Sequence, residues 1–242
     1  MIEKSVKLSS LAFKFGTLGI VGLLMGVILS ALGFQDFEGH NFNFFNHTLS
    51  ELGHYGHSTF AVVINGGLFF GSLSLILFCL FSIQLIDSKL LYSLFLSLVL
   101  TFMSLAAAGL FPVNVYHLHT MAIKYFFYFG SFSSFLYLVY LSMKGRLFYS
   151  SWNAVTGILT FISFLCFLVL SHIDLGLIAG DKQFYQEMVM ELPRPDIWWP
   201  ATLEWLSLTL FMLWGMGMVQ SLRNQAQIKQ VEEGEKSKAI RS

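Results

Sequence analysis

Six long apolar runs, separated by shorter polar segments, make up most of this chain. Each run has about the 20 residues that a helix needs to cross the hydrocarbon of a bilayer. A chain in lipid must satisfy its backbone hydrogen bonds internally, so the runs are predicted to be helices. We expect an all-α polytopic membrane protein: a six-helix transmembrane bundle over residues 1–222, and a polar tail over 223–242 that is frayed helix or disordered. The predicted spans are 14–34, 58–84, 90–112, 118–142, 151–172 and 199–221.

The composition agrees with a chain placed in lipid. Charged residues make up 12% of it, about half the share of a soluble domain. The first run, Phe15 to Phe34, is longer than the core of a signal peptide, about 7–15 residues, so we expect a retained helix. Because the formal net charge is +0, no nucleic acid partner is expected. The expected partners are membrane lipid and other membrane proteins.

Two pairs of glycines are spaced one helical turn apart in the first two spans. Gly22 and Gly26 lie in the first span, and Gly67 and Gly71 lie in the second. Small residues at this spacing allow helix backbones to approach closely. The spacing therefore predicts that these two helices pack against each other.

The basic residues are divided unequally between the two sides of the predicted bundle. Of the 14 lysines and arginines, all but Lys124, Lys182 and Arg194 fall at the N-terminus, in the loops on the same side, or in the tail. Cytoplasmic segments carry such an excess, so both termini are predicted to be cytoplasmic in a bacterial cytoplasmic (inner) membrane. All seven histidines fall in segments predicted on the other side: His40, His47, His54, His57, His117, His119 and His172.

The segment after the first span carries several groups with chemical potential. If it is helical, His47, Glu51 and His54 share one face and would form a site for a divalent metal such as zinc. Ser50 lies one turn from His54, a spacing at which an imidazole activates a hydroxyl. The alternative is purely structural, because Thr48 and Glu51 also match a capping box that opens a short helix.

A second group of polar residues surrounds the turn between the third and fourth spans. Pro112 ends the third helix, and His117 and His119 open the fourth at the outer surface. Residues two apart on a helix point in different directions, so one ring is expected to face the bundle and the other the lipid headgroups. The alternative is a pair of interfacial histidines that bind only backbone or lipid phosphate.

Three polar residues lie inside the predicted spans at matching depth. Asn65, Lys124 and Glu204 each sit roughly 9–11 Å below the outer surface, counted along their helices. An isolated charge in hydrocarbon costs at least a few kcal/mol, which favours a Lys124–Glu204 pair with Asn65 in the same layer. The alternative has Lys124 extended outward and Glu204 protonated. His172 and Asp174, at the outer end of the fifth helix, would complete an outward-facing pocket.

Several short motifs resemble a bacterial and archaeal membrane family known as domain-of-unknown-function family nine-nine-eight. They are Ser50-Glu51-Leu52-Gly53, then Gly109-Leu110-Phe111-Pro112 followed by His117-Leu118-His119 and the Phe126-Phe127 region, and Leu203-Glu204-Trp205 at the start of the last helix. The likeness follows most of residues 14–221 in order. It implies a six-helix bundle and no established activity, substrate or cofactor.

A more distant likeness is to the membrane hydrolases that include alkaline ceramidases and adiponectin-receptor-like proteins. That likeness implies a zinc held by histidines, with a serine and aspartates, for the cleavage of lipid amides. This chain departs from the pattern, because it has six predicted spans rather than seven and lacks a His-x-x-x-His pair on its last helix.

Two hypotheses follow from these residues. The first is a membrane protein of unknown activity whose outward-facing pocket, lined by histidine, serine and carboxylate side chains, binds a lipid or small ligand. The second is a metal-dependent hydrolase acting on lipid at the outer leaflet, with zinc held by histidines and a carboxylate as general base. A transporter is disfavoured, since no pair of broken helices is evident. The candidate catalytic residues are Ser50, Glu51, His54 and Glu204; the candidate ligand-binding residues are Asn65, His117, His119, Lys124 and Glu204; and the candidate metal ligands are His54, His117, His119 and His172.

Overall fold

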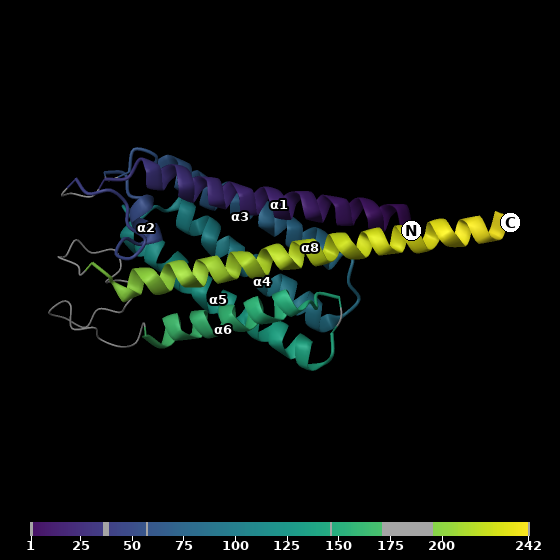
Figure 1. The fold of residues 1–242 in the computed structure, drawn as a ribbon. Helices are drawn as coiled ribbons and strands as arrows, with labels where there is room; N and C mark the ends of the chain where they lie inside the picture. Colours follow the sequence, from purple (N-terminus) through teal and green to yellow (C-terminus); the bar gives the residue numbers. More distant parts are fainter. Residues whose placement is uncertain (1, 36–38, 57, 146, 171–195, 242) are drawn as a thin grey trace.

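The computed structural model describes residues 2–35, 39–56, 58–145, 147–170 and 196–241, with backbone only for 2–3 and 225–241. Apart from two isolated β-bridges, the regular structure of these residues is helical. Figure 1 shows long helices running side by side, with one short helix at the end of the bundle away from both chain termini. The helices are α1 (Ile2–Leu32), α2 (Leu49–Leu52), α3 (Ala61–Ile83), α4 (Lys89–Leu110), α5 (Tyr116–Ser142), α6 (Ser151–Leu170) and α8 (Trp199–Arg241).

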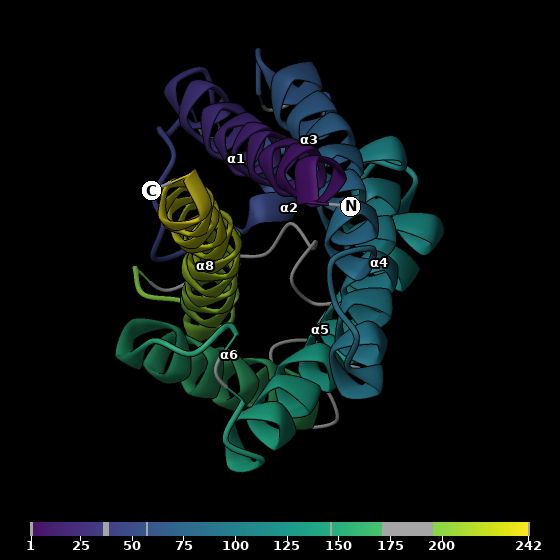
Figure 2. The ribbon, with the colours of Figure 1, turned by 90° about the vertical axis from the view of Figure 1, so that its right-hand side faces the viewer.

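The six long helices are arranged as a closed ring when viewed along the bundle (Figure 2). Going round it, α1 packs on α3, α3 on α4, α4 on α5, α5 on α6, α6 on α8, and α8 returns to α1. Large aromatic side chains fill much of the interior, and the rings of Phe127 and Phe167 stack with centroids 3.6 Å apart. Aliphatic and aromatic side chains are exposed on the outer wall of the ring, among them Leu18, Ile28, Phe70, Leu96, Met103, Phe132, Ile162 and Leu206. An apolar outer wall is the surface that a lipid bilayer covers.

Five of these helices are long and apolar enough to cross a membrane. The chain is therefore an α-helical membrane protein, as the apolar runs predicted. The helix outside this group, α5, has 27 residues but is more polar, since it carries His117, His119 and Lys124. The count of six spans stays a prediction.

The glycine pairs bring α1 and α3 together, which confirms the prediction from their spacing. A Cβ on Gly67 would lie 3.0 Å from the carbonyl oxygen of Gly22 and 3.2 Å from the Cα of Gly26. A Cβ on Gly71 would lie 3.0 Å from the carbonyl oxygen of Gly19. The two backbones are thus in direct contact at these glycines.

Figure 1 shows α2 at the end of the bundle away from the chain termini, and the described histidines lie in the segments beside α2 and at the start of α5. Near the termini, the Ser9 hydroxyl donates to the Leu222 carbonyl at 3.2 Å. The Arg223 guanidinium lies 4.6 Å from the centre of the Phe13 ring. This arrangement agrees with the segregation of basic residues and histidines in the sequence. The side of the membrane that each end faces stays a prediction. Below, the end of the bundle that contains α2 is called the α2 end.

Two helices extend beyond the predicted apolar spans. Helix α1 begins at Ile2, about three turns before the predicted span at residue 14. Helix α8 continues to Arg241, through the described part of the tail for which we expected frayed helix or disorder. Polar residues of good helix propensity extend a helix once a packed apolar segment has nucleated it.

Candidate active site

The short helix α2 is built by its own capping residues. The Glu51 amide donates to the Thr48 hydroxyl at 3.3 Å, and the Thr48 amide donates back to a Glu51 carboxylate oxygen at 2.6 Å. This reciprocal pair is the capping box predicted from the sequence. The helix spans only Leu49–Leu52, so the predicted helical face with His47, Glu51 and His54 does not form. Ser50 is its second residue and is buried.

Ser50 forms a hydrogen bond with a histidine from a distant helix. Its Oγ lies 2.8 Å from Nε2 of His119, in the first turn of α5. The other ring nitrogen, Nδ1, lies 2.8 Å from the Phe111 carbonyl oxygen and 3.2 Å from the Ala108 carbonyl oxygen. Carbonyl oxygens only accept, so Nδ1 carries the proton and Nε2 accepts from the Ser50 hydroxyl. Only 6% of Ser50 and 3% of His119 is exposed.

Pro112 explains why these two carbonyls are available to His119. Within a continuing α4, the Ala108 carbonyl would accept from the backbone N–H of residue 112. Proline has no N–H, so that oxygen is left open, and the end of the helix leaves the Phe111 carbonyl open as well. The imidazole N–H of His119 satisfies both oxygens. The proline therefore helps to fix the ring orientation and tautomer of His119.

Glu204 and Asn65 hold α2 in place from two other helices. A Glu204 carboxylate oxygen accepts from the Leu49 amide at 2.9 Å, and Glu204 is 3% exposed. The Leu49 amide is in the first turn of α2, where an amide has no partner within the helix. At the other end of α2, the Asn65 side-chain amide donates to the Gly53 carbonyl at 2.9 Å. These contacts fix the position of Ser50 relative to α3 and α8.

Tryptophan residues at the start of α8 form hydrogen bonds with the loop that precedes α2. The indole of Trp205 donates to the His47 carbonyl at 2.9 Å, and the Trp198 amide donates to the Phe45 carbonyl at 2.8 Å. The His47 ring is buried and stacks against Phe42 with centroids 5.5 Å apart. The imidazole of His47 is therefore packed among aromatic rings and does not join Ser50.

The remaining predicted residues lie around this centre without converging on it. Nε2 of His54 accepts a hydrogen bond from the side-chain amide of Asn114 at 3.4 Å. The histidine that contacts Ser50 is His119, and not His54 as the sequence predicted. His117 is exposed, which matches the expectation that the two rings of the His-x-His pair diverge. Lys124 lies over the Tyr128 ring, 5.8 Å from its centre. The Lys124–Glu204 pair stays a prediction, since Lys124 contacts Tyr128 and Glu204 contacts the Leu49 amide.

The described residues hold no group of three or more histidine, cysteine or carboxylate side chains arranged for a metal ion. His172 and Asp174 lie outside the described residues, so the full predicted metal set is not placed. Zinc binding through His54, His117, His119 and His172 stays a prediction. The structure does show a serine hydroxyl that is hydrogen-bonded to an oriented imidazole, in Ser50 and His119.

Sequence reasoning included Ser50 and His119 among the candidates but did not pair them. It missed Asn114, whose side-chain oxygen accepts from the Tyr55 amide at 3.0 Å. Asn114 therefore links the loop after α2 to the turn between α4 and α5. Sequence reasoning also missed the carbonyls of Ala108 and Phe111 as partners of His119. The available signal was Pro112, because a proline at a helix end leaves a carbonyl open for another donor.

No family model, curated protein or solved structure matches this chain. Membership of domain-of-unknown-function family nine-nine-eight is therefore still an expectation from short motifs.

Proposed function

We propose that this membrane protein is a serine-dependent acyl-transfer enzyme that acts on carbonyl groups of membrane lipids at the α2 end. The observation that carries the proposal is the 2.8 Å contact between Ser50 Oγ and His119 Nε2, with Nδ1 of the same ring held by backbone carbonyls. Serine hydrolases share this arrangement: the nucleophile is hydrogen-bonded to a general base, and a third group orients that base.

In this proposal Ser50 is the nucleophile and His119 is the general base. Ser50 Oγ attacks the carbonyl carbon of a lipid ester or amide while its proton passes to His119 Nε2. His119 then gives that proton to the departing alkoxide or amine, which leaves an acyl group on Ser50. A water molecule, deprotonated by His119, attacks the acyl carbonyl, and Ser50 recovers its proton as the free acid departs. The Phe111 and Ala108 carbonyls, which accept from Nδ1, stabilise the transient imidazolium.

Glu204 is a positioning residue in this proposal. Its carboxylate touches the Leu49 amide next to Ser50 rather than the serine itself. It therefore acts by holding α2 at a fixed distance from α5. Lipid is the proposed substrate class because the ring of helices has an apolar outer wall, and Phe44 and Phe45 are exposed in the loop that precedes α2.

A second candidate function is the binding of a lipid or small ligand without bond cleavage. It is favoured by the burial of Ser50 and His119, whose polar atoms already satisfy each other.

We also propose that both termini lie in the cytoplasm and that the protein belongs to a bacterial inner membrane. The segregation of basic residues toward one side of the bundle supports this orientation. The short motifs at Ser50, Pro112 and Glu204 support kinship with family nine-nine-eight.

The test is covalent labelling of the purified full-length protein by a fluorophosphonate, which reacts with activated serines. We expect one adduct at Ser50, and none in Ser50→Ala. In His119→Asn, whose amide can still donate toward the Phe111 carbonyl, labelling should slow by about 100-fold or more, the usual contribution of a general base.

The matched control is Ser58→Ala. Ser58 is also buried at the α2 end, and its hydroxyl donates to the Ser30 carbonyl at 3.3 Å. Its loss should leave labelling at Ser50 unchanged. A folded wild-type protein with no adduct at Ser50 refutes the enzyme and leaves ligand binding. An adduct that forms equally fast in His119→Asn refutes the role of His119.

A further inference from the structure

The two chain segments that carry the candidate catalytic residues are joined at two points. One segment runs from Ser50 to Tyr55, and the other runs from Asn114 to His119. At the buried point, Ser50 Oγ lies 2.8 Å from His119 Nε2. At the exposed point, the side-chain oxygen of Asn114 accepts from the Tyr55 amide at 3.0 Å, and its side-chain nitrogen lies 3.4 Å from His54 Nε2. These two contacts of Asn114 form the Asn114 bridge.

The Asn114 bridge is oriented by the backbone and is open to solvent. A backbone N–H only donates, so the oxygen of Asn114 faces Tyr55 and its NH2 group faces His54. Both contacts are exposed, so water competes for the same polar groups. The contacts of α2 with Glu204 and Asn65 are buried and measure 2.9 Å each. The Asn114 bridge is therefore easier to break than the contacts that hold α2 in place.

The Ser50–His119 pair needs an entrance, because only 6% of Ser50 and 3% of His119 is exposed. Ser50 Oγ points to α5, whereas the loop before α2 is hydrogen-bonded to α8. An entrance to this hydroxyl is therefore expected on the α5 side. There the described residues include two exposed stretches, Tyr55-Gly56 and 114–118. The Asn114 bridge is the place where these two stretches meet.

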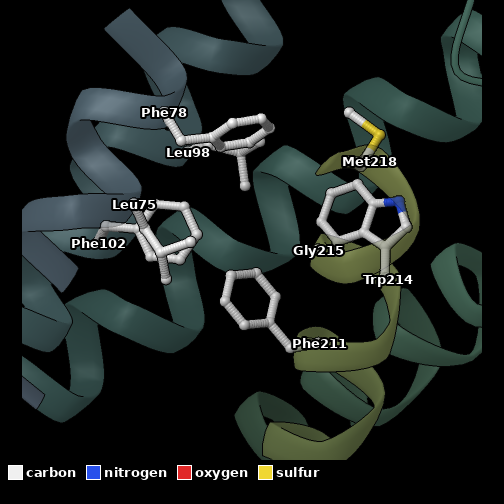
Figure 3. Close-up of a pocket in the computed structure, with 8 residues that line it drawn as sticks. All are labelled: Leu75, Phe78, Leu98, Phe102, Phe211, Trp214, Gly215 and Met218. Carbon is white, nitrogen blue, oxygen red and sulfur yellow. The ribbon is translucent and has the colours of Figure 1, made fainter. Parts of the chain in front are cut away.

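The route through the interior of the helix ring is filled by apolar side chains. Figure 3 shows Phe78 and Phe102 facing Phe211 and Trp214 across a small void between α3, α4 and α8. The rings of Phe102 and Phe211 approach with centroids 5.6 Å apart. A substrate with a polar headgroup would have to displace these packed rings. This leaves the α2 end as the place for an entrance.

We infer that the substrate reaches Ser50 between the loop after α2 and the α4–α5 turn, and that Asn114 closes this entrance. The inference rests on the proposed function, since the entrance leads to the nucleophile assigned there. When the Asn114 bridge breaks, the two exposed stretches can separate while the buried contacts keep α2 in position. Tyr55 and Tyr116 are exposed next to the bridge, and tyrosine is typical of the membrane–water interface. The entrance therefore admits a lipid carbonyl from the headgroup region of the leaflet.

The test measures access to position 50 in the purified full-length protein. Ser50→Cys is made together with Cys166→Ser, which removes the exposed native thiol, and the rate of reaction with N-ethylmaleimide is followed at position 50 by peptide mapping. Asn114→Ala removes both contacts of the bridge. Each hydrogen bond changes an equilibrium constant by about 2- to 12-fold. Because both are exposed, we use the lower value for each, so the rate should rise by about fivefold.

A conservative variant and a matched control accompany this measurement. Asn114→Asp keeps the acceptor for the Tyr55 amide but loses the donor to His54, so the rate should rise by about twofold. The control is Asn43→Ala. Asn43 is also exposed at the α2 end, and its side-chain oxygen accepts from the Phe45 amide at 2.9 Å, within its own loop. Its loss should leave the rate unchanged.

The outcomes separate the entrance from the reaction. A rate in Asn114→Ala that is unchanged or lower overturns the inference, as does an equal rise in Asn43→Ala. If Asn114→Ala does not fold, an unchanged rate in Asn114→Asp overturns it. With Ser50 intact, fluorophosphonate labelling should also rise in Asn114→Ala, whereas a residue that only positioned Ser50 against His119 would slow labelling when lost. Absence of any fluorophosphonate adduct in the wild type refutes the proposed function, and the thiol rates still decide whether Asn114 closes the entrance.

Discussion

The contact between α1 and α3 makes a quantitative prediction through two adjacent glycines. Gly67 and Gly66 are neighbours on α3, but a Cβ on Gly67 meets the backbone of α1, whereas a Cβ on Gly66 meets nothing within 4 Å. Replacement of either glycine by alanine gains the same helix propensity, up to about 1 kcal/mol. The difference between Gly67→Ala and Gly66→Ala therefore isolates the cost of the contact.

The magnitude follows from the two distances. In Gly67→Ala, the Cβ would lie 3.0 Å from the Gly22 carbonyl oxygen and 3.2 Å from the Gly26 Cα. Backbone atoms have no rotamer into which they can retreat, so α1 must move by a few tenths of an ångström. Overpacking of this kind costs about 1–3 kcal/mol. Gly67→Ala should therefore be less stable than Gly66→Ala by about 5- to 150-fold in the unfolding constant.

The assay is equilibrium unfolding in mixed micelles, with increasing sodium dodecyl sulfate and circular dichroism as the readout. We expect Gly66→Ala to match or exceed the wild type, and Gly67→Ala to unfold at lower denaturant. Equal midpoints for the two variants would refute the close packing of α1 and α3. The comparison needs no knowledge of the function.

The remaining predictions concern the site and the topology. Asn65→Ala leaves the carbonyl at the end of α2 without its donor, which should cost about 1–3 kcal/mol of stability in the same unfolding assay; a cost near zero would mean that water replaces the donor. Glu204→Gln keeps an oxygen that accepts from α2 and should retain most fluorophosphonate labelling, whereas Glu204→Leu should lose it; equal labelling of the two would remove Glu204 as a positioning residue. A metal chelator should leave labelling of Ser50 unchanged, and loss of labelling that zinc restores would favour the metal-dependent hydrolase. In intact cells, an impermeant thiol reagent should modify His40→Cys but spare Lys238→Cys, and the reverse pattern would invert the predicted orientation.

Much of the fold could be predicted from the sequence because its signals are local. The apolar runs correspond to long helices because lipid leaves the backbone no partner except itself. The capping box from Thr48 to Glu51 forms between residues three apart, so it is visible in the sequence and present in the structure. The one-turn spacing of Gly22 with Gly26, and of Gly67 with Gly71, likewise indicated a packed face, which the contact of α1 with α3 confirms.

The candidate site was determined by tertiary structure instead. Ser50 and His119 are 69 residues apart, and Leu49 and Glu204 are 155 apart. Spacing along one helix favoured His54 as the partner of Ser50, because a sequence reports only neighbours on the same element. Which of the seven histidines reaches the serine depends on how α2 docks between α3, α5 and α8. The sequence by itself therefore determined the helices and the segregation of charge, and only the packing of distant helices decided which side chains meet.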